Sequence, residues 1–193
     1  MNALSLDHAS FVGVSLGGWL ALDYATRRPT RINRMVVVCP GGVGRQKFGI
    51  LFKVVFFNLC GDWGKRKLRE AILGRMPAGE ASLASRRFGE FFALLHKSAR
   101  PRTEKLPVFR DAALRALTMP VLAIVGANDA LLDSADTRRR VEGLLDNGEV
   151  RYIEGAGHLI LGQGAAIAEF LNGSAIGILS LPGPAGSGRV FRN

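Results

Sequence analysis

Short apolar runs alternate with amphipathic segments at both ends of the chain. The apolar runs, rich in β-branched residues, predict strands at residues 10–14, 34–39, 119–126 and 149–155. Residues 16–28 and 134–145 carry apolar positions at helical spacing, and Pro29 ends the first of these helices. Strands that alternate with helices are typical of an α/β fold with a mostly parallel sheet flanked by helices.

The middle of the chain interrupts this alternation. Residues 44–117 contain helix-like segments but no convincing strand, so we expect a helical cap insertion that stands over the sheet. Its many Phe and Leu residues fit either the wall of an apolar pocket or ordinary helix packing. Residues 173–193 are rich in Gly, Pro and Ser, which predicts a flexible tail. The predicted division is a core of residues 1–43 and 118–172, the insertion and the tail.

Composition narrows the class of protein. The chain has 193 residues, of which 48% are hydrophobic and 22% charged, as expected for one soluble globular domain. The net charge of +10 comes from scattered Lys and Arg without interleaved aromatic residues, so we expect no nucleic-acid partner. No apolar run approaches the roughly 20 residues that cross a bilayer, and the N-terminus lacks the pattern of a signal peptide.

Cysteine and histidine are too sparse for a disulfide framework or a metal site. Cys39 and Cys60 lie in no Cys-x-x-Cys pattern, which favours a reduced, cytoplasmic setting. His8, His96 and His158 have no companions at ligand spacing, so we expect no metal and no other cofactor.

A Gly-x-Ser-x-Gly pentapeptide gives the chain its first candidate chemistry. Gly13-Val14-Ser15-Leu16-Gly17 is a weak signal alone, because the chain has 24 glycines. It follows a predicted strand and opens a predicted helix, as a nucleophile elbow requires. The helix also directs its N-terminal amides at developing negative charge. Ser15 is therefore our candidate nucleophile.

A serine nucleophile needs a base. His158 lies in a Gly-rich loop directly after the last predicted strand, where it would project over the edge of the sheet. His8 precedes the first strand and His96 lies in the predicted insertion, and both are expected at the surface. His158 is the candidate base.

The base needs an acid that holds its tautomer. Asp129 follows the strand at 119–126 and precedes His158 in the chain. Asp133 and Asp136 are rival candidates, but both fall at the start of the next predicted helix. A carboxylate is common there, and Asp133 or Ser134 is placed to cap the first turn of that helix. We assign the role to Asp129.

The order Ser15, Asp129, His158 resembles that of the α/β-hydrolase superfamily, in the branch of serine esterases, lipases and carbon–carbon hydrolases with a helical cap. The matching stretches are "FVGVSLGGWLALDYATRRP", "VVVCPGG", "MPVLAIVGANDALL" and "EGAGH". The resemblance implies a carboxylesterase-type enzyme that cleaves an ester or related acyl substrate through an acyl-enzyme intermediate. The many Phe residues of the predicted insertion suggest that the acyl group is apolar. It implies that Ser15 attacks, His158 relays the proton, Asp129 orients His158 and the Leu16 amide stabilises the oxyanion.

Members of this family carry further strands ahead of the elbow and a second oxyanion donor. Here only nine residues precede the first predicted strand. We expect an N-terminally truncated chain with weak activity alone, since one oxyanion donor is worth about 10² to 10³ in rate. The strand at 10–14 would then expose an apolar edge that seeks a second copy or another chain. We therefore expect one of three cases. The chain is a clipped gene model or fragment of a full hydrolase, it pairs with a second copy or another polypeptide that completes the sheet, or it is a non-catalytic remnant that serves as a binding module.

A phosphate-binding loop is the alternative from another class. A helix N-terminus after a glycine turn can cradle a phosphate. The usual Gly-rich phosphate-binding patterns are missing, however, and this alternative leaves Ser15 unexplained.

Overall fold

The computed structural model describes residues 1–47 and 105–173, together with a few isolated residues between them. The chain divides into two compact units, Met1–Leu161 and Gly162–Asn193. The helical segment predicted at 48–59, most of those at 65–75 and 80–96, and the predicted tail beyond Gly173 lie outside the described residues.

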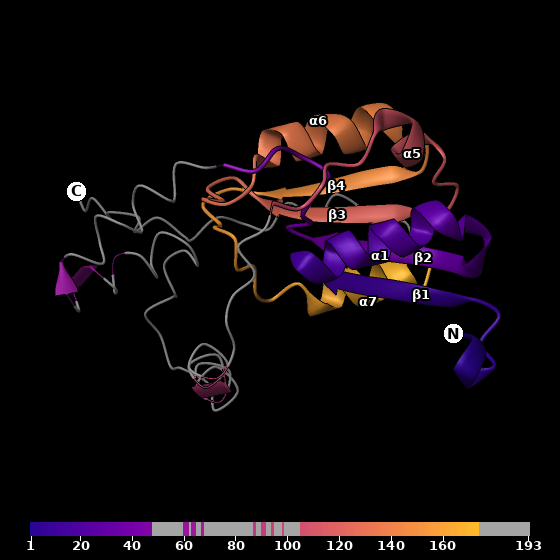
Figure 1. The fold of residues 1–193 in the computed structure, drawn as a ribbon, viewed down its shortest axis with the longest axis horizontal. Helices are drawn as coiled ribbons and strands as arrows, with labels where there is room; N and C mark the ends of the chain where they lie inside the picture. The colour runs from indigo at the N-terminus through magenta and orange to yellow at the C-terminus, as the bar shows by residue number, and fades with distance from the viewer. Residues whose placement is uncertain are drawn as a thin grey trace, which may run out of the picture. The chain divides into compact units, whose positions relative to one another are not determined.

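Four parallel strands form the sheet of the first unit (Figure 1). They are β1 (Ala9–Val14), β2 (Ile32–Val38), β3 (Val121–Gly126) and β4 (Gly148–Ile153), in the order β1-β2-β3-β4. All four predicted strands are thus confirmed, and so is the α/β class. β3 is buried along its whole length, which explains its unbroken apolar sequence.

Helices connect the strands and cover one face of the sheet. The first unit holds α1 (Leu16–Arg27), α5 (Asp111–Arg115) and α6 (Ser134–Leu144), with short 3₁₀ turns η1 (Asn2–Leu4) and η2 (Pro29–Arg31). Asp133 caps α6, because its carboxylate accepts the N–H of Asp136 at 3.0 Å. The second unit holds α7 (Gly164–Leu171).

One apolar core joins the sheet to α1, α5 and α6. Alternate residues of the central strands, such as Met35 and Val121, pack with Leu22 of α1 and Val141 of α6. Leu114 of α5 belongs to the same core, although it lies in the range predicted as the insertion. The boundaries between core, insertion and tail stay a prediction.

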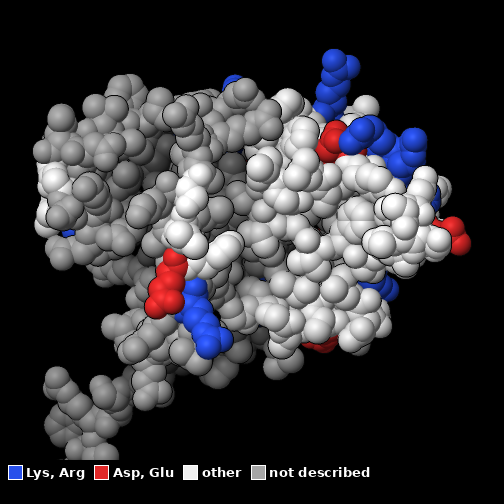
Figure 2. Space-filling model, turned by 60° about the horizontal axis from the view of Figure 1, so that its bottom comes forward, with Lys and Arg blue, Asp and Glu red and all other residues white. Residues whose placement is uncertain are grey.

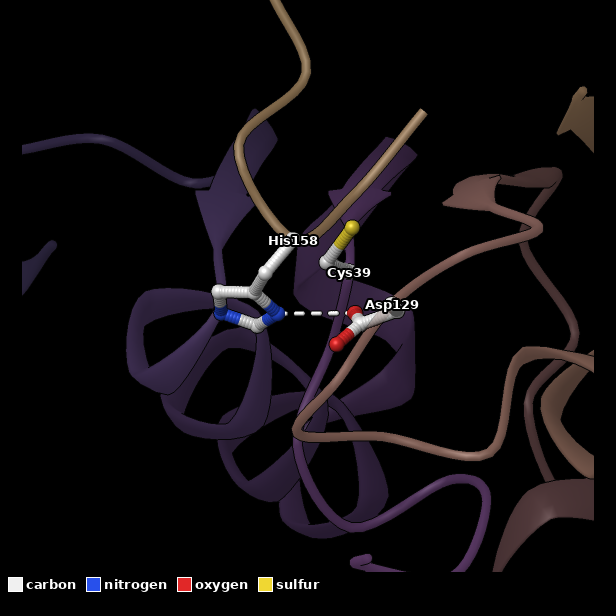
Figure 3. Close-up of side chains that lie close together, drawn as sticks. All are labelled: Cys39, Asp129 and His158. Atoms are coloured by element: carbon white, nitrogen blue, oxygen red, sulfur yellow. Dashed lines mark hydrogen bonds and ion pairs between the residues drawn. The ribbon is translucent and has the colours of Figure 1, made fainter. Parts of the chain in front are cut away.

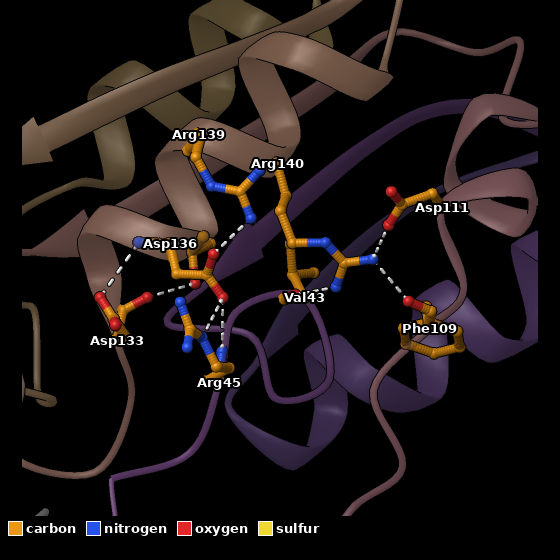
Figure 4. Close-up of polar contacts among 9 residues, drawn as sticks. Val43, Arg45, Phe109, Asp111, Asp133, Asp136, Arg139 and Arg140 are labelled. Atoms are coloured by element: carbon orange, nitrogen blue, oxygen red, sulfur yellow. Dashed lines mark hydrogen bonds and ion pairs between the residues drawn. The ribbon is translucent and has the colours of Figure 1, made fainter.

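Arg140 of α6 joins two segments that are distant in sequence (Figure 4). Its guanidinium donates to the carbonyl of Val43, to the carbonyl of Phe109 at 2.6 Å and to the carboxylate of Asp111 at 2.6 Å. The side chain is only 7% exposed. Val43 follows β2 and Phe109 precedes α5. The Arg140 side chain therefore connects α6 to the segments near both ends of the predicted insertion.

Replacing Arg140 by methionine is expected to lower the free energy of unfolding by about 3 kcal/mol, because it removes a charged donor from the buried carbonyl of Val43 and the half-buried carbonyl of Phe109. Urea denaturation measures the change. Arg138→Met on the same helix is the matched control, since the Arg138–Glu142 pair is about half exposed, and it should cost less than about 1 kcal/mol. Equal losses in the two variants would contradict the role given to Arg140.

β1 forms an edge of the sheet and pairs with β2 alone among the described strands. Val12 is 50% and Val14 55% exposed, and Leu20 on the neighbouring α1 is 56% exposed. Within the part of the chain that the structure describes, β1 is therefore an edge strand, as expected from the sequence, and its neighbourhood carries exposed apolar side chains.

The charged surface of the described residues is mixed. On the face shown in Figure 2, Lys and Arg side chains stand at separate places, with Asp or Glu beside several of them. Among the described helices, none is long and apolar enough to span a membrane.

Candidate functional site

Ser15 occupies the sharp turn between β1 and α1. Its backbone has φ +53° and ψ −112°, a conformation that is rare for a residue with a side chain. Its N–H donates to the carbonyl of Val38 at 2.8 Å, and its carbonyl accepts the N–H groups of Trp19 at 3.1 Å and Gly41 at 3.2 Å. These three bonds hold the strained turn in place.

Two glycines make this turn possible. A Cβ on Gly13 would lie 2.5 Å from the carbonyl oxygen of Gly17, and a Cβ on Gly18 would lie 3.0 Å from Cβ of Pro40. The start of α1 therefore packs directly on the end of β1. Around Gly17 itself, no heavy atom of the described residues outside the local helix backbone lies within 4 Å of an added Cβ.

His158 lies in the loop after β4, and its ring connects the other two candidate residues. Nε2 lies 2.9 Å from Oγ of Ser15, and Nδ1 lies 2.7 Å from Oδ2 of Asp129. The side chain is 12% exposed. The structure thus brings Ser15, Asp129 and His158 into one hydrogen-bonded chain, although residues 15 and 158 are 143 positions apart.

Asp129 lies in the turn after β3 and is buried. Its Oδ1 accepts the N–H groups of Leu131 at 2.8 Å and Leu132 at 3.0 Å, which leaves Oδ2 for His158. Burial raises the pKa of this carboxyl group, but the hydrogen bond and charge of His158 and the two backbone N–H groups outweigh burial, so the pKa lies below its ordinary value.

A Cβ on Gly126 would lie 2.4 Å from the carbonyl oxygen of Gly157. The loop that carries Asp129 and the loop that carries His158 can therefore approach each other closely only because residue 126 has no side chain.

The lowered pKa of Asp129 predicts that acid destabilises the fold. A carboxyl group with a depressed folded pKa contributes stability above its unfolded pKa, and this contribution is lost as the pH falls through the folded value. As the pH is lowered below about 4, the urea concentration at the unfolding midpoint of the wild-type chain should therefore decrease. The midpoint of Asp129→Asn should decrease less. Parallel pH curves for the two chains would contradict this assignment.

The rival candidates lie elsewhere in the structure. Asp133 caps α6, as described above, and Asp136 accepts hydrogen bonds from Arg139 at 2.6 Å and from the N–H of Arg45 at 3.1 Å. His8 is exposed near the start of β1. His96 lies outside the described residues. Neither aspartate is joined to the His158 ring by a hydrogen bond in the described structure.

Leu16 is the first residue of α1. The N–H groups of a first helical turn have no acceptor within the helix, so this amide is available to an oxygen atom bound near Ser15.

Cys39 is the neighbour that the sequence reasoning missed (Figure 3). Its Sγ and one ligand atom each of Asp129 and His158 all lie within 4.8 Å of one another. Such a donor set resembles a metal site. However, Nδ1 and Oδ2 already share a hydrogen bond, and burial, followed by the charge of Asp129, raises the pKa of the thiol to about 12. At neutral pH the thiol is protonated and is therefore a hydrogen-bond donor rather than a thiolate ligand.

A family model and individual relatives assign the chain to the same family. The model of the alpha/beta hydrolase family matches residues 3–170. Carboxylesterase YbfK of Bacillus subtilis is 25% identical over 164 residues, which are 82% of this chain and 54% of that protein. The 2-hydroxy-6-oxo-6-phenylhexa-2,4-dienoate hydrolase of Comamonas testosteroni is 42% identical over 48 residues, or 25% of this chain and 17% of that protein. The chain thus spans about half the length of YbfK.

Solved structures show the same fold. The crystal structure of carboxylesterase CesB (YbfK) from Bacillus subtilis matches with a TM-score of 0.68 at 24% identity, covering 90% of this chain and 63% of that chain. Esterase RhEst1 from Rhodococcus sp. ECU1013 matches with a TM-score of 0.67 at 20% identity, covering 90% of this chain and 69% of that chain. The four parallel strands and their helices are therefore part of an α/β-hydrolase fold. Because the family model matches well over half of its residues, this chain belongs to the α/β-hydrolase family.

Proposed function

We propose that this chain carries the catalytic triad of a serine hydrolase that cleaves a carboxylic ester or related acyl substrate. The observation that carries the proposal is the pair of hydrogen bonds at His158, 2.9 Å to Ser15 and 2.7 Å to Asp129. In this arrangement one ring nitrogen can take a proton from the serine while the other holds its own proton against a carboxylate.

The first half of the proposed reaction forms an acyl-enzyme. Oγ of Ser15 attacks the carbonyl carbon as its proton passes to Nε2 of His158. The negative charge that develops on the carbonyl oxygen is stabilised by the N–H of Leu16. Asp129 stabilises the imidazolium ring. When the tetrahedral intermediate collapses, the alcohol leaves with the proton from Nε2.

The second half releases the acid. A water molecule gives its proton to Nε2 and attacks the ester of Ser15, and the second tetrahedral intermediate collapses to the carboxylic acid as His158 returns the proton to Oγ. Atoms and charges balance without a cofactor.

Esterase activity is tested with short and medium p-nitrophenyl esters, comparing the wild-type chain with Ser15→Ala. The proposal predicts turnover by wild type and none above background by the variant. Urea denaturation shows whether the wild-type chain is folded. A folded wild-type chain that is inactive on every ester would instead support the binding-module alternative.

The relative from Comamonas testosteroni favours a second substrate class, because it is a hydrolase of 2-hydroxy-6-oxo-6-phenylhexa-2,4-dienoate and its matched stretch of 48 residues is 42% identical. The dienoate in its name is therefore included in the assay. Faster turnover of the dienoate than of any ester would assign this chain to carbon–carbon bond hydrolysis.

We also propose that the outer edge of β1 pairs with a strand of a second copy or of another chain. The position of β1 at the edge of the described sheet supports this proposal, and Val12 and Val14 on this strand are exposed. Val12→Lys is expected to abolish self-association in sedimentation equilibrium, whereas Val108→Lys, at an exposed apolar position outside the sheet, should not. A wild-type chain that stays monomeric at all concentrations would contradict pairing between copies.

A further inference from the structure

A short segment at the start of the predicted insertion pairs with the loop that carries Asp129. We call this segment, residues 45–47, the strap, and residues 129–133 the acid loop. Three backbone contacts join them, namely an antiparallel bridge between Gln46 and Leu132 and hydrogen bonds of 2.8 Å from the N–H of Lys47 to the carbonyl of Leu131 and from the N–H of Asp133 to the carbonyl of Arg45. The strap thus contacts Leu131 and Leu132, the two residues whose N–H groups bind Oδ1 of Asp129.

The strap is also bound near the start of α6, which follows the acid loop (Figure 4). The N–H of Arg45 donates to the buried carboxylate of Asp136 at 3.1 Å. A Cβ on Gly44 would lie 2.6 Å from the carbonyl oxygen of Asp133, so the chain that enters the strap packs directly on the end of the acid loop. These contacts do not involve the side chain of Lys47, so its substitution should leave the backbone of the strap in place.

The ammonium group of Lys47 reaches Asp129 itself. Its Nζ donates to the backbone carbonyl of Asp129 at 2.9 Å. Asp129 is 2% exposed, so its backbone polar groups need partners within the protein. A cationic donor forms a stronger hydrogen bond than a neutral one, and because Lys47 is exposed, this bond does not require burial of its charge. Asp129 is therefore fixed at its carbonyl and at Oδ1, while Oδ2 meets His158.

We propose that Lys47 is a positioning residue of the site, which holds the backbone of Asp129 so that Oδ2 lies within hydrogen-bond distance of Nδ1 of His158. The carbonyl that Lys47 binds belongs to the peptide bond that leads toward Leu131. If this peptide turned, the N–H groups of Leu131 and Leu132 would lose their alignment with Oδ1, and the carboxylate could rotate away from the ring. This inference rests on the proposed function, in which Asp129 orients His158.

Amide hydrogen exchange, followed by NMR, tests whether Lys47 holds the acid loop. Lys47→Met keeps a long side chain but has no N–H donor, so the N–H groups of Leu131 and Leu132 should exchange about tenfold faster than in wild type. Lys47→Arg supplies another cationic donor and should restore exchange to within about threefold of the wild-type rate. The N–H of Ala123, in the buried strand β3, should exchange at the wild-type rate in every variant, which separates a local change from a loss of global stability.

Steady-state kinetics with p-nitrophenyl acetate test whether this hold matters to the reaction. Lys47→Met should lower kcat about tenfold and leave KM within about twofold, because the orientation of His158 is needed for the chemical step rather than for binding. Lys47→Arg should return kcat to within about threefold of wild type. Arg138→Met also removes one positive charge, from a half-exposed pair with Glu142, and should match wild type in both measurements.

Faster exchange at Leu131 and Leu132 with an unchanged kcat would overturn the proposal, and so would a lower kcat with unchanged exchange. Equal acceleration at Ala123 would also overturn it, because Lys47 would then act only on stability, as would a Lys47→Arg variant that behaves like Lys47→Met. The exchange measurement needs no turnover. An inactive wild-type chain would therefore count against the proposed function, while exchange at Leu131 and Leu132 still decides whether Lys47 holds the acid loop.

Discussion

The Asp129→Asn variant is expected to lose ester hydrolysis by a factor on the order of 10⁴ while remaining folded. The carboxamide has one oxygen, and the N–H groups of Leu131 and Leu132 both require it. The NH₂ group must then face Nδ1 of His158. Nδ1 becomes the acceptor, the ring proton moves to Nε2, and Nε2 can no longer take the proton of Ser15.

Steady-state rates with p-nitrophenyl acetate measure this loss, and urea denaturation checks the fold. Asp133→Asn is the matched control, because asparagine also caps a helix and this carboxylate binds the N–H of Asp136 rather than His158. It should retain the wild-type rate within about twofold. Full activity of Asp129→Asn would show that the acid of the site lies elsewhere.

Gly13→Ala is expected to cost about 3 kcal/mol or more in unfolding free energy. Its Cβ would lie 2.5 Å from the carbonyl oxygen of Gly17, which is backbone and cannot rotate away. The end of β1 and the start of α1 would have to separate, which also displaces Ser15. Both the urea midpoint and the reactivity of Ser15 should therefore fall.

Gly17→Ala is the matched control within the same pentapeptide. Apart from the local helix backbone, no described residue has a heavy atom within 4 Å of its added Cβ, and alanine is a better helix former than glycine by up to about 1 kcal/mol. Alanine at Gly13 should thus lower the free energy of unfolding, whereas alanine at Gly17 should raise it. A Gly17→Ala variant as unstable as Gly13→Ala would contradict the packing of the elbow.

The strands could be predicted because each is a short β-branched run that ends in glycine or a turn. The exact start of β2 could not be predicted from the sequence. The structure begins it at Ile32, two residues before the predicted start, because Ile32 pairs with Ala9 across an irregular register with β1. That pairing depends on tertiary contacts that no local pattern encodes.

The candidate site could be predicted in outline because parallel strands bring their carboxyl ends to one edge. Ser15, Asp129 and His158 each follow a strand, and the structure joins them by hydrogen bonds. Cys39 also directly follows a strand, and that position was the signal that could have identified it. As a cysteine outside any disulfide or metal-ligand pattern, however, Cys39 is not singled out by residue spacing.

Substrate choice could not be predicted from the sequence. Shape and polarity of a pocket depend on how separate segments pack, and a stripe of Phe and Leu is compatible with both a pocket wall and plain helix packing.

The most direct test of the proposed catalytic triad is covalent labelling with a fluorophosphonate probe, followed by peptide mass spectrometry to locate the adduct. A single adduct on Ser15 is expected, and it should form at least about 10³ times more slowly in His158→Gln and be absent in Ser15→Ala. A folded wild-type chain that takes up no probe, or carries it on another residue, would contradict the account.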